Sequence, residues 1–160
     1  MNVGHATFAL FVEIPVNWGA DWLWGVPLIV LTVVVHVLGL GLIRQKAVGF
    51  TSAISERRHP VAVFVSIVGT ATLLATCLHA LEASIWAIAF RILGAIPDNG
   101  SAMLYSLSAI TSYGHANIYL HGHWELLGAL EALNGWLLFG LTAAFLFAMI
   151  EKVWSLSGRR

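Results

Sequence analysis

The sequence predicts an all-α membrane protein with three spanning helices and one short hairpin that enters the bilayer and returns. Two observations support this prediction. Of the 160 residues, 59% are hydrophobic and only 10% are charged, whereas a soluble domain usually has about 25% charged residues. The apolar residues also gather into three runs that are long enough to cross roughly 30 Å of hydrocarbon as helices. We therefore expect a single membrane domain over residues 1–160.

The apolar runs set the predicted boundaries. The predicted segments are an outer N-terminal segment (1–23), spanning helices at 24–43, 61–90 and 124–150, a cytoplasmic loop (44–60) and a cytoplasmic tail (151–160). Trp18, Trp22 and Trp24 are expected at the depth of the lipid headgroups. Between the second and third spans, Ser101 to Thr111 is an apolar stretch with an Asn-Gly-Ser start. It predicts a short helix that cannot span a bilayer.

The positions of the basic residues predict the orientation. Seven of them lie between the first two spans or after the third: Arg44, Lys46, Arg57, Arg58, Lys152, Arg159 and Arg160. Only Arg91 lies at the other end of the spans. By the positive-inside rule, the N-terminus and residues 92–123 face outward and the C-terminus is cytoplasmic. Because both ends of 92–123 lie outside, its simplest path dips into the membrane and returns. Irregular backbone at that depth must be buried in protein or line water.

Composition also excludes several classes of protein. The formal net charge is zero, which argues against a nucleic-acid partner. The single cysteine, Cys77, offers neither a disulfide nor a CxxC motif. The sequence has no phosphate-binding loop and no recognisable nucleophile–base arrangement, so we do not expect an enzyme.

Three segments resemble the potassium-channel family. Tyr105 to Ile118, YSLSAITSYGHANI, is similar to the pore helix and selectivity filter of that family. Leu126 to Ala144, LLGALEALNGWLLFGLTAA, resembles the inner helix of bacterial members, and His79 to Ala89 resembles the end of the outer helix. The resemblance covers about residues 61–150. It implies a pore helix and re-entrant filter loop at 100–118, a homotetramer in a bacterial inner membrane, and a passive cation channel.

The expected ion filter departs from the family pattern. Aligned without gaps, the usual Thr-Val-Gly-Tyr-Gly-Asp falls on 112–117 and keeps only its first glycine. With the preceding threonine, the filter is expected to comprise Thr111, Ser112, Tyr113, Gly114, His115, Ala116 and Asn117. A left-handed backbone at Ala116 would cost about 1–2 kcal/mol in each subunit, and Asn117 removes a carboxylate from the outer mouth. We therefore expect weak selectivity for potassium, with K⁺ or Na⁺ as the permeant ions and no other cofactor.

The family pattern also suggests roles for residues around the filter. Gly135 corresponds to the gating hinge, although close helix packing would use a small residue there equally well. Glu131, one turn earlier, is expected to brace the filter, because carboxylates inside membranes are usually paired. Glu82 is expected to brace the filter too, or to pair with His79 on the same helix face.

The histidines suggest a different class of function. His115, His121 and His123 lie within nine residues of one another, and together they could bind a metal at the outer mouth. They could equally belong to an exposed polar loop. His36 and His79 could clamp a haem from separate spans, but we expect them at different depths and do not expect haem. The alternatives to a channel are therefore a non-conducting structural or modifying subunit, with an unidentified hetero-subunit as partner, and a membrane metal-binding protein.

Overall fold

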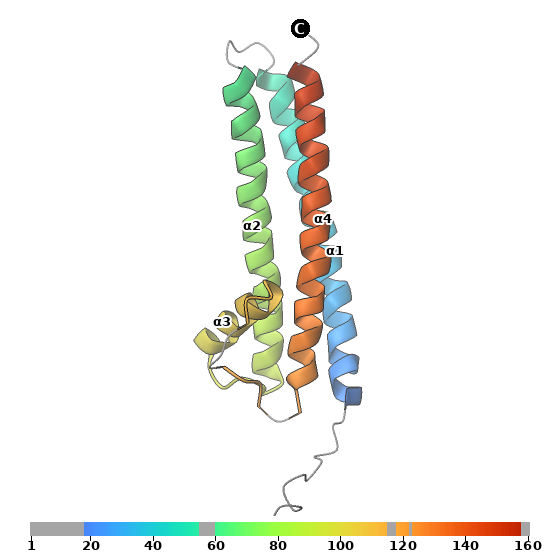
Figure 1. Cartoon of the computed structure of the whole chain (residues 1–160), viewed down its shortest axis with the longest axis vertical. Coiled ribbons are helices and arrows are strands. Elements are labelled where there is room, and N and C mark those ends of the chain that lie inside the picture. Colours follow the sequence, from blue (N-terminus) through green and yellow to red (C-terminus); the bar gives the residue numbers. More distant parts are fainter. Residues whose placement is uncertain (1–17, 55–59, 115–117, 122, 158–160) are drawn as a thin grey trace, which may run out of the picture.

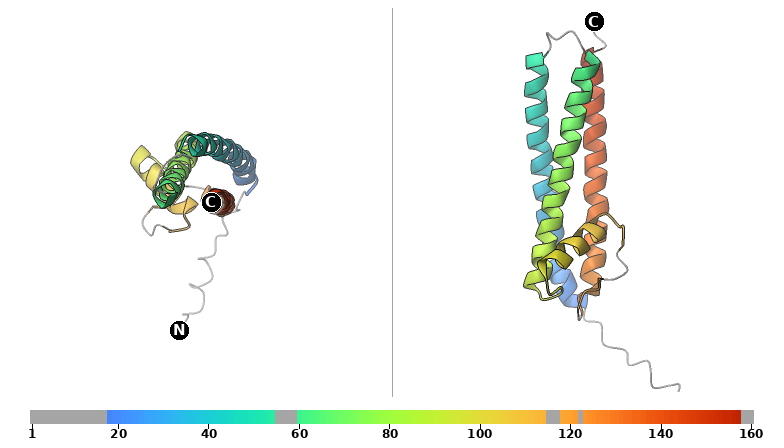
Figure 2. Two further views of the ribbon diagram at one scale, coloured as in Figure 1. Left: turned by 90° about the horizontal axis from the view of Figure 1, so that it is seen from above. Right: turned by 90° about the vertical axis from the view of Figure 1, so that its left-hand side faces the viewer.

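The protein folds into a bundle of three long helices with one short helix against its side. The computed structural model describes residues 18–54, 60–114, 118–121 and 123–157. The helices are α1 (Trp18–Ile54), α2 (Pro60–Ile92), α3 (Asn99–Ile110) and α4 (Glu125–Ser157). α1, α2 and α4 run side by side, and α3 packs against α2 and α4 near one end of the bundle (Figure 1). Viewed along the bundle, α3 lies on the side of α2 away from α1 (Figure 2).

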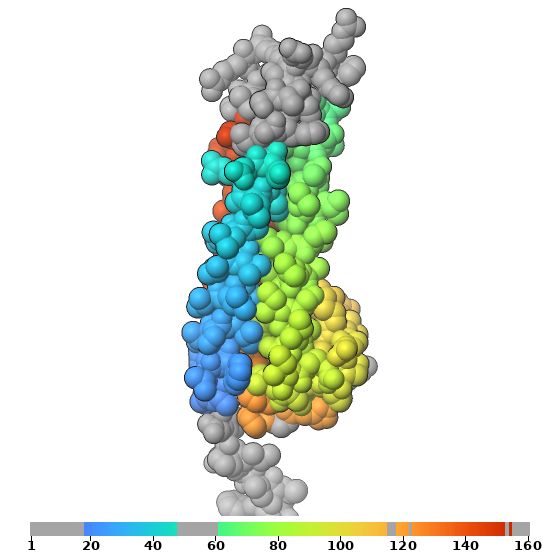
Figure 3. Space-filling model, turned by 180° about the vertical axis from the view of Figure 1, so that it is seen from behind, coloured from blue at the N-terminus to red at the C-terminus, as the bar shows by residue number. Residues whose placement is uncertain are grey.

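The three long helices match the three predicted spans. The segments Trp18–Ala47, Val61–Ile92 and Glu125–Lys152 are long and apolar enough to cross a membrane. The shortest of them has 28 residues and measures about 42 Å, more than the roughly 30 Å of hydrocarbon. Large apolar side chains of all three long helices are exposed on the outside of the bundle. Seen from behind, α1 and α2 lie side by side (Figure 3). Among the described residues, the predicted all-helical fold with three helices able to span a membrane is therefore confirmed.

The first helix extends beyond both ends of the predicted span at 24–43. α1 begins at Trp18, so residues 18–23 are helical and are not part of a separate outer segment. It continues to Ile54, so most of the predicted loop at 44–60 is helical as well. Arg and Lys are good helix formers, and their long side chains can reach water while the backbone stays helical. The charges at Arg44 and Lys46 therefore do not mark the end of the helix.

The early start of α1 also places Pro27 within the helix instead of at its beginning. There its ring removes one backbone N–H from the helical ladder. Residues 1–17 and 158–160, which belong to the predicted terminal segments, lie outside the described residues.

The end of α2 is tied directly to the start of α3. Gly94 has a φ of 68°, and it closes α2 with backbone hydrogen bonds that satisfy the last carbonyls. The Arg91 guanidinium donates to the Ile96 carbonyl at 2.9 Å and to the Asn99 side chain at 2.7 Å. Asp98 caps α3 by accepting the Ser101 N–H at 2.8 Å. Hydrogen bonds from Ser101 also hold the pKa of the Asp98 carboxyl below its ordinary value.

The short helix ends far from the end of the bundle. Its last residue, Ile110, packs so closely against Gly135 that a side chain has no room there, because a Cβ on Gly135 would overlap the Ile110 carbonyl oxygen. Gly135 is ten residues after Glu125, so this contact lies about 15 Å along α4. The chain then comes back to the same end of the bundle (Figure 2), where the His121 N–H donates to the Ala95 carbonyl at 2.8 Å. α3 was predicted at Ser101 to Thr111 and is observed within two residues of that range.

The tight contact at Gly135 leads to a stability prediction. Gly135→Ala places a methyl group on the Ile110 backbone, so we expect a loss of about 1–3 kcal/mol in the free energy of unfolding. Gly140→Ala, on the same helix, is the matched control because a Cβ there meets nothing within 4 Å. Thermal unfolding in one detergent compares the two variants. Equal melting temperatures would contradict the packing described for α3.

Candidate functional site

The expected filter segment begins as the cap of α3. Thr111 is the C-cap residue, and Ser112 follows it in the left-handed region with a φ of 53°. The Ser112 N–H donates to the Ala109 carbonyl at 2.8 Å, and the Tyr113 N–H donates to the Ser108 carbonyl at 2.9 Å. This pair of bonds is a Schellman motif, in which the left-handed residue is usually glycine. Ser112 therefore ends the helix by adopting a conformation that is unfavourable for its residue type.

Only part of the filter segment can be placed. Gly114, like Ser112, has a positive φ, of 69°. Tyr113, which lies between these two residues, is 82% exposed. Thr111, Ser112 and Gly114 are exposed as well. His115, Ala116 and Asn117 lie outside the described residues, so the expected backbone strain at Ala116 stays a prediction.

Glu131 is buried against α3. Ser106, which is also buried, lies 2.6 Å from the Ala83 carbonyl of α2 and forms a second hydrogen bond with Glu131 of α4. A hydroxyl has one hydrogen. If that hydrogen goes to the carbonyl, the Glu131 carboxyl must be the donor in the second bond and is therefore neutral. The two hydrogen bonds of Ser106 on α3 therefore join this helix to both α2 and α4.

The face of α4 that meets α3 is made of small residues on either side of Glu131. A Cβ on Gly128 would overlap the Tyr105 hydroxyl oxygen, and the corresponding contact at Gly135 involves the α3 backbone. Gly128, Glu131 and Gly135 are spaced by three and four residues, which places them on one side of a helix. Of the two roles considered for Gly135, the structure supports close packing; the hinge stays a prediction.

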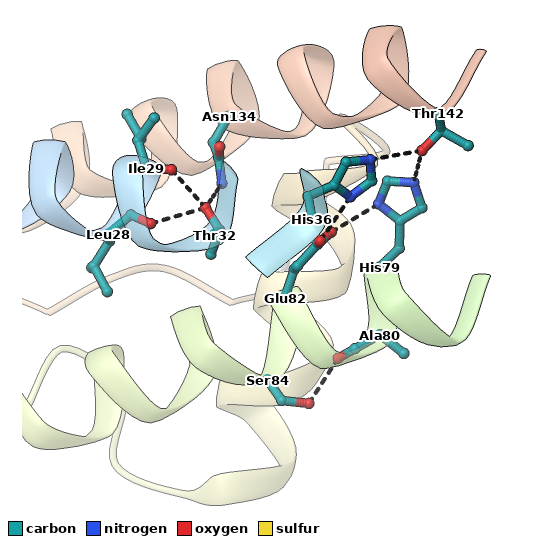
Figure 4. Close-up of polar contacts among 10 residues, drawn as sticks. All are labelled: Leu28, Ile29, Thr32, His36, His79, Ala80, Glu82, Ser84, Asn134 and Thr142. Atoms are coloured by element: carbon teal, nitrogen blue, oxygen red, sulfur yellow. Dashed lines mark hydrogen bonds and ion pairs between the residues drawn. The ribbon is translucent and has the colours of Figure 1, made fainter. Parts of the chain in front are cut away.

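Glu82 has different partners from those expected of a residue that braces the filter. Its Oε1 lies 2.7 Å from Nδ1 of His36 on α1, and its Oε2 lies 3.2 Å from Nδ1 of His79 (Figure 4). The Nε2 atoms of the two rings both reach Oγ1 of Thr142 on α4, at 3.1 and 3.0 Å. The expected contact between His79 and Glu82 is thus observed, in a cluster that joins α1, α2 and α4.

The expectation that His36 and His79 lie at different depths is wrong. Their ring centroids are 5.1 Å apart. Counted from the outer ends of the predicted spans, at 24 and 90, the two residues are 12 and 11 residues in, so both lie at about 17 Å. The expected difference in depth came from comparing positions as fractions of predicted spans that have unequal lengths, 24–43 and 61–90.

Two further buried polar contacts join α1 to α4. The Asn134 amide donates to the Thr32 hydroxyl oxygen at 2.7 Å, and the Leu127 N–H donates to Asp21 at 2.9 Å. Asp21 thereby satisfies one of the free backbone N–H groups at the start of α4. None of Asp21, Thr32, Asn134 and Thr142 was predicted from the sequence. The only feature of the sequence that could have indicated a buried polar contact is that each is a polar residue within or beside an apolar run.

The outer-mouth histidines are only partly placed. His121 and His123 are exposed, and the His123 ring lies 4.6 Å from the Trp124 ring. Because His115 is outside the described residues, the predicted site that includes it stays a prediction. Within the part of the chain that the structure describes, one group of three metal-ligating side chains converges, and it consists of His36, His79 and Glu82.

Two hollows flank the end of α3. One has a volume of about 470 Å³ and lies between α3 and α4, with Tyr105, Ser112 and Gly128 in its wall. The other has a volume of about 440 Å³ and is lined by Thr76, His79, Ile110, Thr111, Ser112, Gly135, Trp136 and Phe139. The second hollow therefore connects the histidine cluster with the first residues of the expected filter.

Comparison of the chain with models of protein families, with curated proteins and with solved structures gives no match. The similarity to potassium channels therefore rests on residues 79–89, 105–118 and 126–144 alone.

The bond between Ser106 and Glu131 gives a second stability prediction. Ser106→Ala leaves the Glu131 carboxyl buried without a partner, so we expect a loss of about 1–3 kcal/mol in the free energy of unfolding. Glu131→Gln is expected to be tolerated, because its amide can donate to the serine as a neutral carboxyl does. Ser66→Ala is the control, since the exposed Ser66 hydroxyl bonds only to the Ala62 carbonyl of its own helix. Unfolding curves in detergent measure all three variants. A Glu131→Gln variant as unstable as Ser106→Ala would show that the carboxyl is not the donor.

Proposed function

We propose that this chain is one subunit of a tetrameric, weakly selective cation channel. The observation that supports this most strongly is the path of residues 93–124. α3 starts at the end of the bundle where α2 ends, and its last residue packs about 15 Å along α4. The chain then returns to the same end. If that end faces outward, as the basic residues predict, the segment is a re-entrant hairpin and α3 is its pore helix.

The exposure of the loop after α3 supports assembly of several copies. Thr111 to Gly114 are exposed in the single chain, although they follow a helix end that would lie well inside the hydrocarbon. Irregular backbone at such a depth is stable only against protein or water. Copies arranged around a central axis would supply both, because each loop would face its neighbours and a shared aqueous pore. The number four comes from the resemblance to potassium channels.

The electrostatics of α3 favour cations at its end. Aligned peptide dipoles leave about half a negative charge at the C-terminus of a helix. In the proposed assembly, four such ends would point toward the axis at the level of Thr111 and Ser112. If the Glu131 carboxyl donates to Ser106 and is neutral, it would fix the position of each helix without adding a charge that competes for the ion.

The residues of the loop argue for weak selectivity. Potassium filters surround the ion with rings of backbone carbonyls that replace its hydration shell. Here Ser112 takes its positive φ in the turn that ends α3, and Ala116 stands where the family has a second glycine. A full set of carbonyl rings is therefore not expected. The loop would offer a shorter site, formed by the Ser112 hydroxyl and the carbonyls near Gly114, that passes K⁺ and Na⁺.

Single-channel recording tests the proposal. The purified protein is placed in planar bilayers under a potassium/sodium gradient, beside the triple variant Tyr113→Val/His115→Tyr/Ala116→Gly. We expect the wild type to conduct with little preference and the variant to prefer potassium, because it restores the family residues. Gly140→Ala is the matched control and should conduct as the wild type does. If neither the wild type nor the triple variant conducts, the channel proposal fails in favour of a non-conducting membrane subunit.

A further inference from the structure

The cluster of His36, His79 and Glu82 is the strongest candidate for a second site. The three side chains come from α1 and α2, and one donor atom from each lies within 4.8 Å of the other two. The His36 and Glu82 side chains are fully buried, while His79 is 28% exposed. Two histidines and one carboxylate are a common ligand set for zinc and for other divalent transition metals. The cluster therefore has the chemistry of a metal site inside a helix bundle.

The orientation of the imidazole rings suits a metal ion bound between them and the carboxylate. Both rings direct Nε2 to the Thr142 hydroxyl oxygen, at 3.1 and 3.0 Å, and this oxygen has two lone pairs. If both Nε2 atoms carry hydrogens, each donates to one lone pair. Both Nδ1 atoms are then bare and face the Glu82 carboxylate. Two nitrogen lone pairs and a carboxylate repel one another unless a proton or a metal ion lies between them, and one metal ion can accept all three.

The carboxylate has a buried oxygen that no hydrogen bond satisfies. Glu82 Oε2 has no hydrogen-bond partner among the described residues. Its contact with His79 Nδ1 is an ion-pair contact, at 3.2 Å. If both rings instead donate through Nδ1, only one Nε2 atom can receive the single Thr142 hydrogen. Without a metal, the cluster therefore needs either one imidazolium or two different tautomers with a protonated Glu82, whereas a metal ion can be bound by two identical neutral rings and the carboxylate.

We propose that His36, His79 and Glu82 bind one divalent transition-metal ion of the zinc class, and that Thr142 orients both imidazoles. Ligand atoms about 2.1 Å from a tetrahedral ion are roughly 3.4 Å apart. The observed separations between the Nδ1 atoms and the carboxylate oxygens are 2.7 and 3.2 Å. A small outward movement of the side chains therefore makes room for the ion. Thr142 plays the part of the hydrogen-bond partner that usually fixes the ring of a metal-bound histidine.

The site can be reached through the hollow beside α3. His79 lines the cavity of about 440 Å³ together with Thr76, Thr111 and Ser112. A fourth coordination position on that side is open to a ligand from the cavity. An ion bound here would hold α1 to α2 and, through Thr142, to α4. This proposal is independent of the channel proposal, because its ligands require one folded chain and neither a pore nor a tetramer.

Metal binding to the full chain in detergent tests the proposal. After chelator treatment, the protein is dialysed against Zn²⁺ and the retained metal is counted by elemental analysis. We expect one tightly bound ion per chain in the wild type, at least 100-fold weaker binding in Glu82→Gln, and about 10- to 100-fold weaker binding in Thr142→Val. The control His121→Gln/His123→Gln removes two exposed histidines that could bind metal adventitiously, and it should retain the ion.

A spectroscopic measurement keeps the test decisive if a variant does not fold. Co²⁺ added to the metal-free wild type should give the intense visible absorption of a four-coordinate ion, with size-exclusion chromatography and circular dichroism confirming the fold. The proposal is overturned if the folded wild type retains no ion, or if cobalt shows only the weak spectrum of its hydrated form. It is also overturned if the His121→Gln/His123→Gln control loses the ion while Glu82→Gln keeps it.

Discussion

A polar side chain buried in an apolar bundle needs a hydrogen-bond partner within the protein, because neither lipid nor the core offers water. This constraint determines the arrangement of the molecule. Its interior contains buried polar side chains at Asp21, Thr32, His36, Glu82, Ser106, Ser108, Glu131, Asn134 and Thr142. Most of them bond to a different helix. Since an unpaired polar group in such surroundings costs several kcal/mol, these contacts favour one rotation and one register for each helix where apolar packing alone would allow many.

The same constraint explains how α3 is held. A helix of 12 residues is marginal by itself, and α3 is fixed by contacts along its length. Asp98 caps its beginning, Ser106 bonds to α2 and α4 at its middle, and Ile110 packs on Gly135 at its end. The glycines of α4 let the backbones approach, and Glu131 supplies a polar contact at the centre of that interface. These features favour a rigid platform for the loop that follows, which is what the proposed pore requires.

Much of the fold could be predicted from the sequence, because hydropathy depends on each segment alone. The three spans and α3 follow from the lengths of the apolar runs and from the Asn-Gly-Ser start of the short one. The ends of α1 could not be predicted in this way, since the helix continues through the charged residues Arg44 and Lys46 to Ile54. The bonds of Thr32 to Asn134 and of His36 to Glu82 depend on which helices face each other. One sequence does not specify this. The backbone at 115–117, where selectivity would be decided, lies outside the described residues.

The central claim is that copies of this chain surround a common pore with one hairpin each. Native mass spectrometry of the protein, released from detergent under gentle conditions, tests it without depending on conductance or on bound metal. The account predicts an assembly of four copies of the 17.3 kDa chain, stable when the protein is diluted. A protein that stays monomeric or dimeric under conditions that preserve its helical content would contradict the claim, because one re-entrant loop per chain cannot then close a pore.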